Sequence, residues 1–183
     1  MRLEYYEKSF SDHGKTPLGM GYNGTDEVRQ YQAINKVAGP SGTIVDLGCG
    51  YGIGKRVFPD LVGVDIHRRP LSGGMVNGTH ECIRRADWVL MCGIFSIGYS
   101  WDEVMDVVES MWAVSDVGIA CTFLLTESAY FDGRATGFPW LNWQILFGKL
   151  DIDFVVEVGW DAYLAAAVCR KKMQVINMKG LRN

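Results

Sequence analysis

The chain has 183 residues, a length typical of one domain. Hydrophobic residues make up 48% of the sequence and charged residues 21%, which is enough apolar material for one core and argues against a disordered chain. The formal net charge is −3, so the broad basic surface of a nucleic-acid-binding protein is not expected. No apolar run predicts a transmembrane helix, and the first ten residues do not resemble a secretory signal.

The cysteine residues predict a reduced protein rather than a disulfide framework. Their number is odd, no pair has CxxC spacing, and all except Cys82 stand among apolar residues. We therefore expect a cytoplasmic protein with mostly buried thiols. The histidines have no ligand spacing to one another or to a cysteine pair, so no metal site is expected. The residues concerned are Cys49, Cys82, Cys92, Cys121, Cys169, His13, His67 and His80.

The first 25 residues contain several glycines and a proline without clear periodicity, so we expect an ordered loop or lid there. Residues 26–38 predict a helix, because apolar residues recur every three positions and form one stripe. Glycines and a proline at 39–42 end this helix. The stripe consists of Val28, Tyr31, Ile34 and Val37.

Short β-branched or apolar runs then alternate with helical segments, as in α/β proteins. A helix begins after Ser100, where Glu103 completes a capping box, and another begins with Pro139. Two further strands near the end are joined by only four residues, too few for a parallel crossover, and so form an antiparallel hairpin. Strands are predicted at 43–47, 61–65, 75–78, 88–92, 117–125, 154–158 and 163–169.

This order predicts a doubly wound, mostly parallel, Rossmann-like α/β sheet with a C-terminal antiparallel hairpin. The domain covers 26–172, with the loop or lid at 1–25 and a tail at 173–183. Only 21 residues separate Asp65 from Asp87, so the connection between the second and fourth strands is abbreviated. Ligands of such sheets bind beyond the carboxyl ends of the strands.

The most informative motif is VDLGCGYG, residues 45–52, which follows the first strand. Glycines at alternate positions let a ligand approach the backbone closely. Asp46 precedes the first of them by two residues; a pyrophosphate is repelled by such a carboxylate, whereas an ammonium or sulfonium group is tolerated. Nineteen residues later, Asp65 ends the second strand, where an acid can accept both hydroxyls of a ribose.

The motifs DLGCGYG and GVDI, with the terminal hairpin, resemble class I S-adenosylmethionine-dependent methyltransferases over roughly residues 26–171. Weaker similarity links HGKTPLGMGYNGTDE, VLMCGIF and CTFLLTESAYFDG to small bacterial or phage-type methyltransferase-domain proteins. The resemblance implies that S-adenosylmethionine binds here and leaves as S-adenosylhomocysteine. The residues that it assigns to this cofactor are Asp46, Gly48, Cys49, Gly50, Gly52, Ile53, Asp65, Ile66, Thr79, Cys92 and Gly93.

The sequence identifies no catalytic base, which is needed only if the acceptor keeps its proton at neutral pH. His13, His80, Glu127 and Asp132 are the candidates. The leading hypothesis is methyl transfer to a small molecule or an accessible side chain, with an acceptor pocket built by the first 25 residues and by loops 94–100 and 126–138.

That hypothesis has three alternatives: a non-catalytic binding protein, a nicotinamide or flavin fold, and a nucleic-acid base methyltransferase. A non-catalytic S-adenosylmethionine-binding partner or regulatory protein remains open, as does a protein partner or a homodimer. A nicotinamide or flavin fold is disfavoured because Ile53 occupies a glycine position of GxGxxG. A nucleic-acid base methyltransferase is disfavoured because the segment from Met91 to Ser96 lacks the Asn/Asp-Pro-Pro-Tyr/Phe turn.

Overall fold

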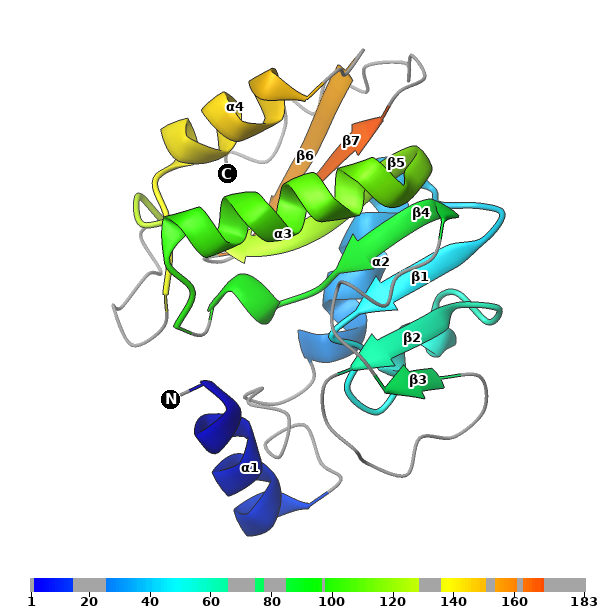
Figure 1. Ribbon diagram of the computed structural model, residues 1–183, viewed down its shortest axis with the longest axis vertical. Helices are drawn as coiled ribbons and strands as arrows, with labels where there is room; N and C mark the ends of the chain where they lie inside the picture. Colours follow the sequence, from blue (N-terminus) through cyan, green and yellow to red (C-terminus); the bar gives the residue numbers. More distant parts are fainter. Residues whose placement is uncertain are drawn as a thin grey trace.

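The computed structural model describes residues 2–14, 26–65, 75–77, 85–96, 98–128, 136–150, 154–160 and 163–169. Its strands form one seven-stranded sheet in the order β3-β2-β1-β4-β5-β7-β6 (Figure 1). The strands are β1 (Ile44–Leu47), β2 (Val62–Asp65), β3 (Met75–Asn77), β4 (Ala86–Met91), β5 (Ser115–Leu124), β6 (Phe154–Trp160) and β7 (Tyr163–Cys169). The helices are α1 (Arg2–His13), α2 (Asp26–Ala38), α3 (Trp101–Val114) and α4 (Trp140–Lys149), with short 3-10 helices η2 (Ile53–Arg56) and η4 (Ile94–Ser96).

The strand directions confirm the predicted fold class. The first five strands pair in parallel, and β7 is antiparallel to both of its neighbours, β5 and β6. The terminal hairpin therefore turns back into the sheet, with β7 inserted between β5 and the edge strand β6. The strand β7 has the predicted bounds, whereas β6 is two residues longer than predicted, since it continues through Trp160, which pairs with Tyr163.

Helices cover both faces of the sheet, as a doubly wound arrangement requires. On one face, α2 packs its buried residues Tyr31, Ile34 and Val37 against the sheet, as the predicted stripe implies. On the other face lie α3 and α4, whose buried residues belong to one core cluster; Figure 1 shows α3 crossing in front of the central strands. The sheet is therefore buried from both sides, which explains why its central strands are almost continuously apolar.

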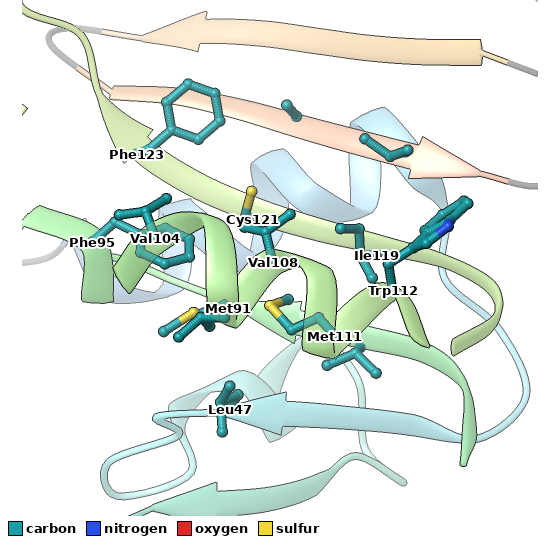
Figure 2. Close-up of a cluster of buried hydrophobic side chains, with 14 of the residues drawn as sticks. Leu47, Met91, Phe95, Val104, Val108, Met111, Trp112, Ile119, Cys121 and Phe123 are labelled. Carbon is teal, nitrogen blue, oxygen red and sulfur yellow. The ribbon is translucent and has the colours of Figure 1, made fainter. Parts of the chain in front are cut away.

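The core beneath α3 consists of buried apolar side chains. Figure 2 shows Val104 and Val108 of α3 facing the sheet, close to Met91 of β4 and Cys121 of β5. None of these four side chains is more than 2% exposed. Full burial of such a side chain stabilises the fold by about 1.5–3 kcal/mol.

The helix ends agree with the sequence at α3 and differ by one residue at α4. Ser100 Oγ accepts a hydrogen bond from the backbone N–H of Glu103, whose carboxylate accepts one from Ser100 N–H, so the capping box is present. Pro139, predicted as the first helical residue, is instead the N-cap of α4, because its ψ of 143° is extended. The strand-like ψ directs the preceding chain away from the helix axis.

The N-terminal helix α1 corrects the prediction of a loop. Residues 2–13 form α1, and only the segment from 14 onward is rich in glycine. Residues 2–13 contain neither glycine nor proline, which is compatible with a helix. The prediction treated residues 1–25 as one segment, so the glycines from residue 14 onward hid the helical character of the first part. Figure 1 draws α1 on the side of the sheet toward which β1, β2 and β4 point. None of the helices in the described residues is long and apolar enough to cross a membrane.

Candidate functional site

The glycine-rich loop leaves β1 at the carboxyl edge of the sheet. Gly48, Gly50 and Gly52 all have positive φ values, between 53° and 77°, which side chains rarely adopt. The backbone is therefore left-handed at three positions of the loop, the last of which, Gly52, is the N-cap of η2. These glycines are required by backbone conformation, and they also leave the loop without side chains where a ligand can approach.

The second strand holds this loop in place. Backbone N–H groups of Gly48 and Cys49 donate to the carbonyl oxygen of Val64, at 2.7 and 3.2 Å. Asp65 Oδ2 accepts the N–H of Gly50 at 2.8 Å, and the Asp65 side chain is buried. The predicted ribose acid thus lies directly beside the predicted cofactor loop, and one of its oxygens orders that loop.

Asp46 is the most unusual group of the site. It is 0% exposed, and its Oδ2 accepts a hydrogen bond of 2.6 Å from the Tyr31 hydroxyl of α2. Its other oxygen, Oδ1, is buried without a hydrogen-bond partner. Burial raises the pKa of Asp46 to about 7; the Tyr31 hydroxyl opposes this rise and the Asp65 charge adds to it.

A second buried chain of hydrogen bonds fixes the turn after β4. The N–H of Gly93 donates to Thr122 Oγ1 of β5 at 2.8 Å, and Thr122 donates to Gln30 Oε1 of α2 at 2.6 Å. Both side chains are 0% exposed, and Gln30 Nε2 is buried without a partner. Gly93, assigned to the cofactor by the sequence, is therefore positioned by two residues that the sequence did not single out.

The loop after β4 closes onto the glycine loop. A Cβ added to Gly48 would lie 2.5 Å from Ile94 Cδ1, so the two segments are in direct contact. The structure thus brings the predicted cofactor residues Asp46, Gly48 and Gly93 to one edge of the sheet. This edge is the ligand position of open α/β sheets.

The two loops expected to face the acceptor are bonded to each other. Thr136 N–H donates to the carbonyl oxygen of Ser96 at 2.7 Å, and Thr136 Oγ1 accepts the N–H of Gly98 at 2.9 Å. Ser96 is itself buried and donates to the carbonyl oxygen of Gly93 at 2.5 Å. One continuous set of hydrogen bonds therefore links the turn after β4 to the segment before α4.

The cysteines at the site are packed thiols. Burial raises the pKa of Cys49 and of Cys92, and the charge of Asp46 raises both further. Burial also raises the pKa of Cys121 to about 12. All three are buried, reduced thiols, so they stay neutral near pH 7 and lack the thiolate that nucleophilic catalysis needs.

The described catalytic candidates lie in different settings. His13 is exposed at the end of α1. Glu127 Oε1 accepts the backbone N–H of Trp140 at 2.9 Å, so this carboxylate caps α4. His80 and Asp132, like the cofactor candidates Ile66 and Thr79 and the abbreviated connection after β2, lie outside the described residues. Among the residues that the structure describes, no group of three metal-binding side chains occurs.

The functional residues that sequence reasoning missed are Gln30, Tyr31 and Thr122. Tyr31 was recognised only as part of the apolar stripe, although a buried tyrosine hydroxyl usually has a polar partner. Gln30 and Thr122 carried no signal of their own, since they are 92 residues apart in the chain.

No protein-family model and no curated protein matches the chain. Solved structures do. An S-adenosylmethionine-dependent methyltransferase of Thermotoga maritima, described as a possible histamine N-methyltransferase, matches with a TM-score of 0.63 and 16% identity, over 92% of this chain and 96% of that one. The magnesium protoporphyrin IX methyltransferase of Synechocystis, with S-adenosylhomocysteine bound, matches with a TM-score of 0.66 and 14% identity, over 93% and 97% of the two chains.

The N-methyltransferase NodS of Bradyrhizobium japonicum, in complex with S-adenosylhomocysteine, gives a TM-score of 0.66 at 12% identity, over 92% of this chain and 98% of that one. Likeness at such low identity concerns the fold. Together with the strand order, it shows that the chain has the class I methyltransferase fold, as its motifs predicted.

Proposed function

We propose that the chain binds S-adenosylmethionine at the glycine loop and transfers its methyl group to a small molecule or an accessible side chain. The observation that carries this proposal is the unpartnered Asp46 Oδ1, buried next to three glycines with positive φ. A buried carboxyl oxygen without a donor is costly unless a ligand supplies one, and the cationic groups of this cofactor fit the requirement.

The residues of the site divide the work of binding. Asp46 would attract a cationic group of the cofactor, and Asp65 would accept the ribose hydroxyls while holding Gly50. Gly48, Cys49, Gly52 and Ile53 would line the methionine portion from the loop. Cys92 and Gly93 would lie beside the sulfonium, and Ile66 and Thr79 would contact the adenine side.

Methyl transfer from S-adenosylmethionine requires few catalytic groups from the protein. When bound, S-adenosylmethionine supplies a methyl group that is already electrophilic, so the chain's task is to align a nucleophile and exclude water. The bonded loops around Ser96 and Thr136 would form walls of the acceptor pocket. The small-molecule methyltransferases among the similar structures support an acceptor of this class.

Calorimetry with S-adenosylmethionine and S-adenosylhomocysteine tests the first half of the proposal, and binding of neither compound would refute it. Transfer of a labelled methyl group onto metabolite, peptide and nucleic-acid pools tests the second half. Label in the metabolite or peptide pool is the expected result. Label in nucleic acid alone would overturn the acceptor class.

A second candidate function, a cofactor-binding partner or regulatory protein without transfer activity, has one observation in its favour. Glu127, a candidate base, is engaged by Trp140 N–H and by the Thr126 hydroxyl. Tight cofactor binding without label in any pool, alone or with added cell extract, would favour this candidate over the enzyme.

A further inference from the structure

We propose that Asp46 carries a proton when the site is empty and that binding of the cationic cofactor displaces it, so that binding is coupled to proton release. The inference rests on the proposed function and deepens it. In the step, the O–H bond at Asp46 Oδ1 breaks, its electron pair stays on the carboxylate, and the proton passes to the buffer. The cofactor's positive charge then balances the new negative charge.

Geometry gives the first argument. Asp46 is fully buried in β1, and among the described residues its carboxyl group has one hydrogen-bond donor, the Tyr31 hydroxyl at Oδ2. A carboxylate in this position would bury a full negative charge with one hydrogen bond and an unsatisfied Oδ1. A proton on Oδ1 removes that charge, and a buried ionisable group without a counter-ion neutralises itself in this way.

The surroundings give the second argument, because no described neighbour compensates the charge. From β2, Asp65 faces Asp46 and adds negative charge; from α2, Tyr31 donates its hydroxyl. From the glycine loop and the turn after β4 come Cys49 and Cys92, both neutral thiols. The cations of η2 are Lys55 and Arg56. Lys55 acts on the pKa of Cys49, and neither residue contributes to the raised pKa of Asp46.

The direction of the coupling follows from these contacts. Burial holds the pKa of Asp46 near 7 in the empty site, and a bound cation must lower it. Affinity for S-adenosylmethionine should therefore rise with pH until Asp46 is ionised in the free protein as well. For one proton with a pKa of about 7, the gain between pH 6.2 and 7.2 is roughly four- to fivefold.

The experiment is calorimetry of S-adenosylmethionine binding to the full chain in phosphate and in imidazole, buffers of low and high ionisation enthalpy. This pH range lies above the sequence pI of about 5.6 and keeps the ligand's own amino group mostly protonated. The difference in observed enthalpy counts the protons released. We expect roughly 0.9 proton per site at pH 6.2 and roughly 0.4 at pH 7.2.

Two variants separate Asp46 from other proton sources. Asp46→Asn should bind more weakly and release no proton. Tyr31→Phe removes the hydrogen bond that favours the carboxylate, so release at pH 7.2 should increase toward one proton. Asp87→Asn is the matched control, because Asp87 bonds Thr43 at the opposite edge of the sheet, and its proton release should equal that of the natural chain.

The outcomes are distinct. Absence of binding refutes the proposed function and this inference with it. Binding with the same enthalpy in both buffers refutes the inference alone, as does proton release that Asp46→Asn leaves unchanged. If Asp46→Asn does not fold, an unshifted release profile in Tyr31→Phe gives the same refutation.

Discussion

Gln30 and Thr122 form a hydrogen bond of 2.6 Å in the interior of the protein, although α2 and the carboxyl-terminal part of β5 are far apart in the chain. Thr122 also accepts the N–H of Gly93, so the hydroxyl of this β5 residue connects α2 with the turn after β4. The pair ties the position of α2 to the backbone that would face the cofactor.

Thr122→Val should destabilise the fold by about 2–3 kcal/mol, because it leaves Gly93 N–H and the Gln30 amide unpaired in the core. Urea unfolding measures this change in the free energy of unfolding. Thr122→Ser, which keeps the hydroxyl, should cost less. In the double variant with Gln30→Leu, the loss should be smaller than the sum of the two single losses; additive losses would show that the pair is not coupled.

The pKa of Asp46 also predicts how stability depends on pH. In the native state it is raised to about 7, above the value of 3.8 for an unfolded chain, so between these values the native state binds more protons. Stability of the cofactor-free protein should fall as pH rises through this window and level off above it. Between pH 6.2 and 8 the expected loss is about 1 kcal/mol.

Asp46→Asn should remove this part of the pH dependence, and urea titrations at the two pH values check it. Because the variant no longer buries an ionisable group, it should be more stable than the natural chain at pH 8. A natural chain whose stability rises over this range would contradict the assignment.

Gly48→Ala should destabilise the protein by more than about 1 kcal/mol, since φ is +76° and the new Cβ would meet Ile94 Cδ1 at 2.5 Å. Adding Ile94→Ala should recover only the part due to the clash. The matched control is Gly148→Ala in α4, where a Cβ meets nothing within 4 Å and helix propensity predicts a gain of about 0.5–1 kcal/mol. Thermal unfolding distinguishes the opposite signs.

Asp65→Ala should weaken S-adenosylmethionine binding by about 1–3 kcal/mol, because it removes the ribose acceptor and frees Gly50 N–H. Asp87→Ala offers a close comparison, since Asp87 Oδ2 likewise accepts a backbone N–H, that of Thr43, at 2.7 Å. Calorimetry should find weaker binding for the first variant and unchanged affinity for the second. If the Asp65→Ala and Asp87→Ala variants bind S-adenosylmethionine with equal affinity, Asp65 does not contact the cofactor.

Local patterns predicted most of the described elements, because periodicity and capping depend on residues that are close together in the sequence. The stripe of α2 and the capping box at Ser100 are examples. The N-terminal helix was missed because a glycine-rich segment follows it directly. The predicted strand pattern placed Asp46 and Asp65 at one edge of the sheet, since parallel strands end together.

The hydrogen bonds that shape the site could not be predicted in the same way. Tyr31 reaches Asp46, and Gln30 reaches Thr122, only because α2 crosses the sheet at a particular position. That position results from packing over the whole face. Consequently the sequence indicated a cationic ligand near Asp46, but it did not indicate that the Tyr31 hydroxyl donates a hydrogen bond to the same carboxyl group.

The hydrogen bonds of Thr136 to Ser96 and Gly98 have a consequence for altering acceptor choice. Two walls joined in this way respond as a unit, so a substitution in one displaces the other. Selection experiments that randomise a single loop should mostly return inactive or unchanged proteins, and altered acceptor preference should arise from paired changes on both sides of Thr136.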